Sequence, residues 1–238
     1  MKRASGATTP ARRHFERLTG LWGTEVGLSI FTGLLAVQLF VVSPLANLGV
    51  FGNRSFESAF SLLLVWGAFA LHSGRLLRVL VGICVGLAVG LRWTTTWLPI
   101  PWIAAAGSLL AVATLGCFAA IVLKRVFEPG PVTRHRIHGA VCAYLLFGLM
   151  WAAAYAFVAQ VVPHPFSVAT DVDPSEAFVA RFVYFSFVTL TTVGYGDITA
   201  VHPLARTLVT IEALIGQLYP AIIIGDLVSS ALANRPKA

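Results

Sequence analysis

The sequence predicts an all-α membrane protein, and its composition and length carry that prediction. Hydrophobic residues make up 57% of the 238 residues and charged residues only 11%, whereas soluble domains carry roughly 25% charged residues. The mean hydropathy is +0.81. A chain of this length has room for about six membrane-spanning helices of about 20 residues and one shorter re-entrant segment. Little of the chain then remains for a soluble domain.

Six apolar runs can each cross, or nearly cross, a bilayer as a helix. They are residues 24–42, 56–71, 76–93, 102–123, 140–162 and 204–233. The sequence Glu128-Pro129-Gly130-Pro131 interrupts any helix between the fourth and fifth runs, because proline lacks a backbone N–H. We therefore expect a four-helix unit before this break and a second unit after it.

Lys and Arg are distributed unevenly between the two sides that six crossings define. Thirteen of the 17 lie in the N-terminal segment, the second and fourth loops, and the C-terminal tail. Cytoplasmic segments are enriched in these residues, so we expect both termini in the cytoplasm. We also expect the protein to lie in the plasma (inner) membrane. The other four, Arg54, Arg92, Arg181 and Arg206, would lie on the outer side. This orientation accounts for the net charge of +7, and no nucleic-acid partner is predicted.

The N-terminal segment, residues 1–23, is basic and lacks the apolar run of a cleaved signal peptide. Two interpretations are open. The segment is either solvated in the cytoplasm or lies as an amphipathic helix on anionic lipid.

A polar stretch punctuated by glycine separates two apolar segments near the end of the chain. Its sequence is Thr191-Thr192-Val193-Gly194-Tyr195-Gly196-Asp197. Glycines at every second position, as at Gly194 and Gly196, permit the positive φ angles that turn successive carbonyls toward one axis. The Thr192 hydroxyl can add an oxygen at the inner end, while Val193 and Tyr195 would point back into protein. Rings of such oxygens replace the water around a cation, so we interpret this stretch as an ion selectivity filter.

The stretch resembles the signature of potassium channels, and the resemblance extends over residues 140–233. The preceding segment, 177–190, is similar to the pore helix of the family, with Tyr184 and Phe185 where many members carry a tryptophan pair. The following segment, 204–233, is similar to the inner helix.

The resemblance implies that potassium ions bind at Thr192, Val193, Gly194 and Tyr195, and that Asp197 is a hydrogen-bonded brace behind the filter. No other cofactor is implied. Because one chain supplies a single filter strand, the resemblance also implies a homotetrameric pore.

These predictions divide the chain into five parts. They are a cytoplasmic basic segment (1–23), a four-helix transmembrane unit (24–127), a cytoplasmic linker (128–139), a pore domain (140–233) and a short cytoplasmic tail (234–238). Within the pore domain we expect an outer helix at 140–162, a pore helix at 177–190, the filter at 191–197 and an inner helix at 204–233.

The predicted inner helix contains Gly216 and Pro220, four residues apart. Pro220 has no N–H to donate to the Gly216 carbonyl, so the helix is expected to be bent or bendable there. In the family a glycine at the position of Gly216 is a hinge, and bending would open a gate. A static kink that only shapes the cavity is the alternative. The resemblance places Gln217, Ile224 and Val228 along the cavity and inner gate, where dewetting between apolar side chains could stop conduction.

Three of the few acidic residues precede the predicted pore helix. Asp171, Asp173 and Glu176 would form a negative outer vestibule in a tetramer, although Asp171 and Asp173 also suit a solvated turn and Glu176 the first turn of the helix.

Two further acids lie in the inner helix. Glu212 would be near mid-membrane, where a charged carboxylate costs roughly 2.5–3.5 kcal/mol on insertion scales. We expect it to be hydrogen-bonded behind the pore helix rather than to sense protons. The resemblance places Asp226 near the inner mouth of the cavity.

Six-helix channels of this superfamily often use their first four helices as a voltage sensor. The fourth run, residues 102–123, contains no Lys or Arg. Arg75 and Arg78 lie at the cytoplasmic start of the third run, where snorkelling explains them. We therefore predict that gating is not steeply voltage-dependent.

The function that the resemblance implies is a potassium-selective channel that conducts passively and catalyses no reaction. The alternatives are a less selective monovalent cation channel, a subunit of a potassium-uptake transporter, and a non-conducting channel subunit. A transporter of that kind would carry four degenerate pore loops in one chain, whereas this sequence has one intact loop. Cys84, Cys117 and Cys142 fall in apolar runs, so neither a disulfide framework nor a metal site is predicted.

Overall fold

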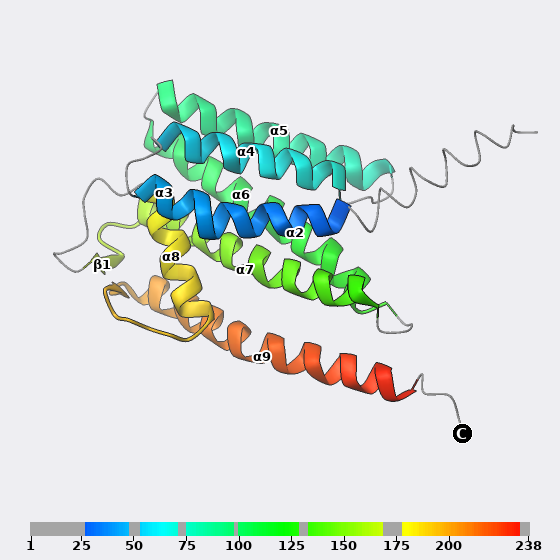
Figure 1. Cartoon of the computed structure of the whole chain (residues 1–238). Coiled ribbons are helices and arrows are strands. Elements are labelled where there is room, and N and C mark those ends of the chain that lie inside the picture. The colour runs from blue at the N-terminus through cyan, green and yellow to red at the C-terminus, as the bar shows by residue number, and fades with distance from the viewer. Residues whose placement is uncertain are drawn as a thin grey trace, which may run out of the picture.

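The structure is a computed structural model that describes residues 27–47, 53–70, 75–97, 100–128, 133–168 and 178–233. Helices dominate these residues (Figure 1). The helices are α2 (Gly27–Val37), the π-helical turn η2 (Gln38–Val42), α3 (Ser43–Asn47), α4 (Asn53–Ala70), α5 (Arg75–Trp97), α6 (Pro101–Val126), α7 (Arg134–Val161), α8 (Phe178–Leu190) and α9 (Pro203–Ala233). The two strands are β1 (Phe166–Val168) and β2 (Ile198–Ala200).

Four stretches of helix in the described part of the chain are long and apolar enough to cross a membrane. They are Gly27–Leu45, Pro101–Val126, Arg136–Val161 and Pro203–Ser230. The apolar parts of α4 and α5, Ser58–Ala68 and Val81–Thr95, are shorter. The chain is therefore an α-helical membrane protein, and the full plan of six spans stays a prediction.

The structure is helical at each of the six predicted runs, but helix ends and apolar ends differ. α7 begins at Arg134, inside the segment 128–139 that we expected to be a linker. The outer helix is thus Arg134–Val161 rather than 140–162. The prediction was too short because apolar residues mark only the part of a helix that crosses lipid, and a polar end continues into water. The first run ends in η2, a π-helical turn of five residues.

α7 connects the N-terminal helices to the C-terminal ones, since it contacts α2, α6, α8 and α9. α5 packs on α6 and α4 on α5, so these two helices lie on the side away from α9 (Figure 1). Between α2 and α6, the buried rings of Phe31 and Phe118 meet edge to face with centroids 5.9 Å apart. Gly67 of α4 allows this packing, because a Cβ there would lie 2.7 Å from the Phe118 ring.

β1 and β2 pair antiparallel, with Phe166 opposite Ala200 and Val168 opposite Ile198. The pairing brings together the two ends of the segment that contains α8 and the predicted filter. α8 lies between α7 and α9 (Figure 1). The sequence did not predict the strands, because three residues are too few to show an alternating pattern. Residues 191–197 therefore run from the end of α8 to the start of β2.

Candidate functional site

The backbone of the predicted filter has positive φ angles at every second residue. The values are 59° at Thr192, 60° at Gly194 and 80° at Gly196. Glycine adopts such angles readily, but a β-branched threonine does so only under strain that the surrounding structure must hold. The alternation begins at Thr192, one step before the first glycine of the predicted pattern.

The last carbonyls of α8 hold the start of the filter. The Thr192 N–H donates to the Thr189 carbonyl over 2.9 Å, and the Val193 N–H donates to the Val188 carbonyl over 2.9 Å. The Leu190 carbonyl accepts from the Tyr144 hydroxyl of α7 over 3.2 Å. Because a helix leaves its last carbonyls without intrahelical donors, these filter amides and the tyrosine take that place. The end of α8 and the start of the predicted filter are thus one hydrogen-bonded unit.

α9 meets this unit at Gly216. A Cβ built on Gly216 would overlap the carbonyl oxygen of Leu190, so glycine is required for this close approach. At the next residue, Gln217 Nε2 donates to Thr192 Oγ1 over 2.8 Å. Gly216 and Gln217 therefore lie against the end of α8 and the start of the predicted filter. The packing explains the glycine without any bending, and its role as a hinge stays a prediction.

Glu212 is buried behind the pore helix, where α7, α8 and α9 meet. The Tyr155 hydroxyl donates to Glu212 Oε2. Ser186 Oγ lies 2.5 Å from Glu212 Oε1 and 2.7 Å from the Gly148 carbonyl oxygen. Tyr155, Ser186 and Glu212 all have an exposed fraction of 0%. The expectation that Glu212 is hydrogen-bonded behind the pore helix is confirmed, and the structure adds the partners that the sequence did not name.

The proton count in this cluster constrains Glu212. The three oxygen–oxygen contacts are Tyr155 to Glu212, Ser186 to Glu212, and Ser186 to the Gly148 carbonyl. Each needs one proton, and the hydroxyls of Tyr155 and Ser186 supply two. A protonated Glu212 supplies the third. A carboxylate would leave two oxygens facing each other across a contact of hydrogen-bond length, without a proton between them.

The two aromatic residues expected in place of the tryptophan pair face different ways. Phe185 is 5% exposed, and its ring centroid lies 5.1 Å from that of Tyr155 and 5.5 Å from that of Phe166. Tyr184 is 40% exposed in a single chain. Phe185 therefore belongs to the aromatic packing behind the predicted filter within one chain.

Asp197 marks the outer end of the filter, and its Oδ1 accepts from the Ile198 N–H over 3.0 Å. This hydrogen bond is local, so the brace behind the filter stays a prediction. The residues of the predicted outer vestibule, Asp171, Asp173 and Glu176, lie outside the described residues, as do segments 1–23 and 234–238.

The C-terminal half of α9 continues as one helix through Pro220 to Ala233. Ile224 is 61% exposed and Val228 is 52% exposed, whereas Ile223 is 6% exposed. Ile223 belongs to the buried core, so one face of this half packs within the chain while the face of Ile224 and Val228 is uncovered.

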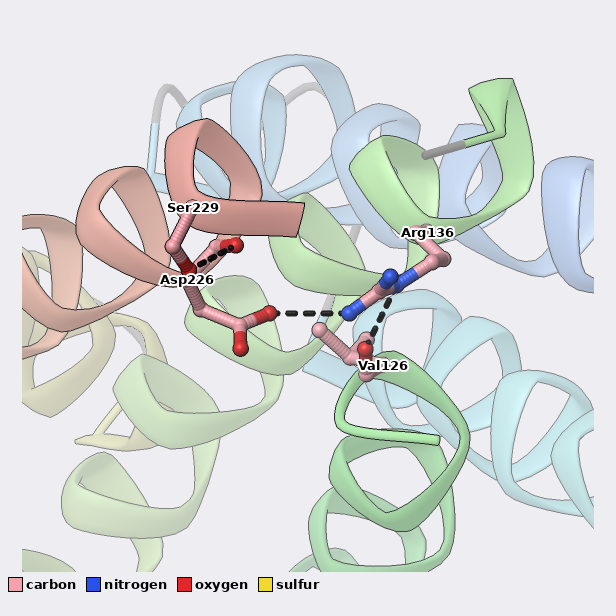
Figure 2. Close-up of polar contacts among 4 residues, drawn as sticks. All are labelled: Val126, Arg136, Asp226 and Ser229. Carbon is pink, nitrogen blue, oxygen red and sulfur yellow. Dashed lines mark hydrogen bonds and ion pairs between the residues drawn. The ribbon is translucent and has the colours of Figure 1, made fainter. Parts of the chain in front are cut away.

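Arg136, near the start of α7, joins the ends of two other helices (Figure 2). Its Nε donates to the Val126 carbonyl at the end of α6 over 2.8 Å, and its Nη2 pairs with Asp226 Oδ2 of α9 over 2.8 Å. The Arg136 side chain is 9% exposed and that of Asp226 is 33% exposed. The Ser229 hydroxyl donates to the Asp226 backbone carbonyl over 3.0 Å. Sequence reasoning counted Arg136 only as a topology signal, because its partner is 90 residues away.

Comparison with known proteins finds similarity to ion channels in the C-terminal part of the chain. Residues 141–232 match the family described as ion channel. The chain is 37% identical over 79 residues to the inward rectifier potassium channel Kirbac3.1 of Paramagnetospirillum magnetotacticum, an alignment that covers 33% of this chain and 24% of the relative. The chain thus matches about a quarter of that relative's length. No solved structure matches. Residues 141–232 are thus similar to ion channels, and part of the chain is similar to a potassium channel.

Proposed function

We propose that four copies of this chain form a potassium-selective channel that conducts passively across the plasma membrane. One observation carries the proposal: the filter backbone has left-handed φ angles at Thr192, Gly194 and Gly196, every second residue. The similarity of residues 141–232 to ion channels supports it. Each chain would cross the membrane six times, with both termini in the cytoplasm.

Potassium ions would bind between rings of oxygens from Thr192, Val193, Gly194 and Tyr195. In an ordinary strand, successive carbonyls point in opposite directions. A left-handed angle at alternate residues turns every second peptide plane, so that successive carbonyls can point to one side and replace the hydration shell of the ion. The strained angle of Thr192 fits this role, since strain of this kind gathers at binding sites that are held ready for a ligand.

The exposure of the filter supports an assembly of several copies. Val193 is 53% exposed and Tyr195 is 72% exposed in one chain, although the sequence predicts that both face protein. Irregular backbone cannot face lipid, because unpaired peptide groups there cost several kcal/mol each. Only 17% of the residues in the apolar stretch of α9 are buried, against 67% in that of α7. Three neighbouring copies around an axis would cover these side chains and leave the filter facing water.

The gate of the proposed channel lies in the cytoplasmic half of α9. Pro220 has no N–H for the Gly216 carbonyl, so bending in this turn would move the exposed Ile224 and Val228 relative to the pore axis. Pro220→Ala restores the hydrogen bond and is expected to change the open times of single channels. Altered conductance with unchanged open times would indicate a static kink instead.

Flux into liposomes tests the proposed function. Purified protein in vesicles loaded with potassium should take up Rb⁺ from a potassium-poor medium and exclude Na⁺. Gly194→Ala, at φ 60°, should reduce this selectivity, whereas Gly225→Ala, where a Cβ meets nothing within 4 Å, should leave it unchanged. Equal uptake of Na⁺ and Rb⁺ would indicate a less selective cation channel. If the folded protein takes up neither ion, it would be a non-conducting subunit.

Vesicles with and without anionic lipid test whether residues 1–23 bind lipid.

A further inference from the structure

We infer that Gln217 is a positioning residue for the innermost ion site of the filter, where its side-chain amide fixes the orientation of the Thr192 hydroxyl. The inference rests on the proposed potassium channel and deepens it. Its basis is the 2.8 Å hydrogen bond from Gln217 Nε2 to Thr192 Oγ1, which connects the inner helix directly to a filter oxygen.

The position of the amide is fixed by two contacts that precede it along α9. Gly216 lies against the Leu190 carbonyl so closely that a Cβ would overlap the oxygen. One turn earlier, Glu212 contacts Ser186 of the pore helix over 2.5 Å. The backbone of α9 at Gln217 is therefore held at a set distance from the end of α8, and a side chain of glutamine length reaches the filter.

The Thr192 hydroxyl has one proton and two lone pairs. The Gln217 amide occupies one lone pair, so the other lone pair is left for an ion and the hydroxyl proton must point elsewhere. Because threonine has few allowed χ1 rotamers, this one hydrogen bond suffices to hold the oxygen in a single orientation. The amide N–H also brings partial positive charge next to the oxygen, which weakens its attraction for a cation. Gln217 thus sets both the direction and the strength of this ligand.

Single-channel recording in planar bilayers tests the inference with three variants. Gln217→Leu removes the donor and keeps much of the side-chain volume, and Gln217→Glu keeps the length but offers only acceptors. Both should change the potassium concentration for half-maximal conductance by about three- to tenfold, and with it the Rb⁺ to K⁺ permeability ratio. Gln160→Leu is the matched control, because Gln160 donates to Ser108 between α7 and α6, away from the filter. It should leave both values unchanged.

A double-mutant cycle separates positioning from a general structural effect. In a Thr192→Val background, which has no hydroxyl, Gln217→Leu should have no further effect, whereas in Thr192→Ser it should act as in wild type. Calorimetric titration of the solubilised protein with K⁺ gives the same comparison if a Thr192 variant does not conduct. Wild-type values in Gln217→Glu would show that Thr192 is the donor and overturn the inference, as would equal shifts in the presence and absence of the hydroxyl.

These outcomes are distinct from failure of the proposed function. Unchanged ion affinity in Gln217→Leu, with potassium conduction intact, overturns this inference alone. A wild-type protein that does not conduct potassium overturns both.

Discussion

The two halves of α9 are attached to the rest of the chain in different ways. In the N-terminal half, Glu212, Gly216 and Gln217 make close contacts with α8 and the predicted filter, and the contacts of Glu212 are buried. In the C-terminal half, after Pro220, Asp226 forms an ion pair with Arg136 of α7. From this difference we expect the N-terminal half, which would be the outer half in the proposed channel, to be held more firmly than the C-terminal half, which would be the cytoplasmic half.

The energies of the two kinds of attachment differ in the same direction. Breaking a buried hydrogen bond leaves an unpaired polar group, at about 1–3 kcal/mol for each group. An exposed ion pair contributes about 0–1 kcal/mol, and in this pair the Asp226 side chain is 33% exposed while the Arg136 side chain is 9% exposed. In the proposed channel, the outer half would then determine which ion passes and the cytoplasmic half when it passes.

The largest expected effect is a loss of stability when one methyl group is added at Gly216. The same change at Gly225, in the other half of α9, is the comparison. Gly216→Ala would place a Cβ on the Leu190 carbonyl, and backbone at the end of α8 cannot swing away as a flexible side chain would. We expect a loss of about 3 kcal/mol in the free energy of unfolding, measured by thermal unfolding in detergent. Gly225→Ala, where a Cβ meets nothing within 4 Å, is the control. Equal midpoints for the two variants would contradict the close approach of α9 to α8.

The Glu212 cluster gives the next effect. Glu212→Leu removes the partner of the buried Tyr155 hydroxyl and should cost about 1–3 kcal/mol of stability. Glu212→Gln should be close to wild type, because its amide can donate to Ser186 while its carbonyl accepts from Tyr155, as a protonated glutamate does. Thermal unfolding of both variants checks the prediction. A Gln variant as unstable as the Leu variant would show that Glu212 is a carboxylate.

Neutralising Asp226 should affect gating and leave selectivity unchanged. Arg136 belongs to α7, which packs on the side of α9 away from the exposed Ile224 and Val228, so the ion pair draws the cytoplasmic end away from that face. Asp226→Asn should therefore lower the ratio of open to closed times by about fivefold, the equivalent of about 1 kcal/mol.

Exchanging the two charges is the control for this pair. Arg136→Asp combined with Asp226→Arg should recover part of the open time that either single change loses. If the exchange is no better than the single changes, the ion pair is not what holds the helix end.

The smallest expected effect is on voltage dependence. Steep gating moves three to four charges in each of four subunits, and each charge is worth about 2.3 kcal/mol per 100 mV. Residues 102–123 contain no Lys or Arg, and the basic residues in the last turn of α6 are Lys124 and Arg125, at the end that we predict to be cytoplasmic. The slope of open probability against voltage should correspond to few charges. A limiting slope on the order of ten elementary charges would contradict the absence of a sensor.

Helices and the filter backbone could be predicted because their signals are local. Apolar runs of membrane length indicate spans, and the spacing of Gly194 and Gly196 requires backbone that other residues rarely adopt. The structure has positive φ at both glycines. The same angle at Thr192 had no local signal, because a threonine adopts it only where surrounding contacts hold it there.

The contacts between distant segments could not be predicted from one sequence. Glu212 could be recognised as a residue needing partners, but Tyr155 and Ser186 are identified only by how α7, α8 and α9 pack. The ion pair of Arg136 and Asp226 could not be predicted for the same reason. Arg136 was explained as a topology signal and Asp226 as a residue near the inner mouth of the cavity. Gly216 and Gln217 lie in the helix that was predicted at 204–233, but only the structure shows their approach to Leu190 and Thr192.

Recording Gln217→Leu and Asp226→Asn in the same planar bilayers tests the separation of the two halves most directly. For each variant, the Rb⁺ to K⁺ permeability ratio and the open probability are measured against wild type. We predict that Gln217→Leu changes the permeability ratio at unchanged open probability, and that Asp226→Asn changes the open probability at an unchanged ratio. A variant of either half that changes both quantities to a similar extent would contradict the account, because the filter and the cytoplasmic end would then move together.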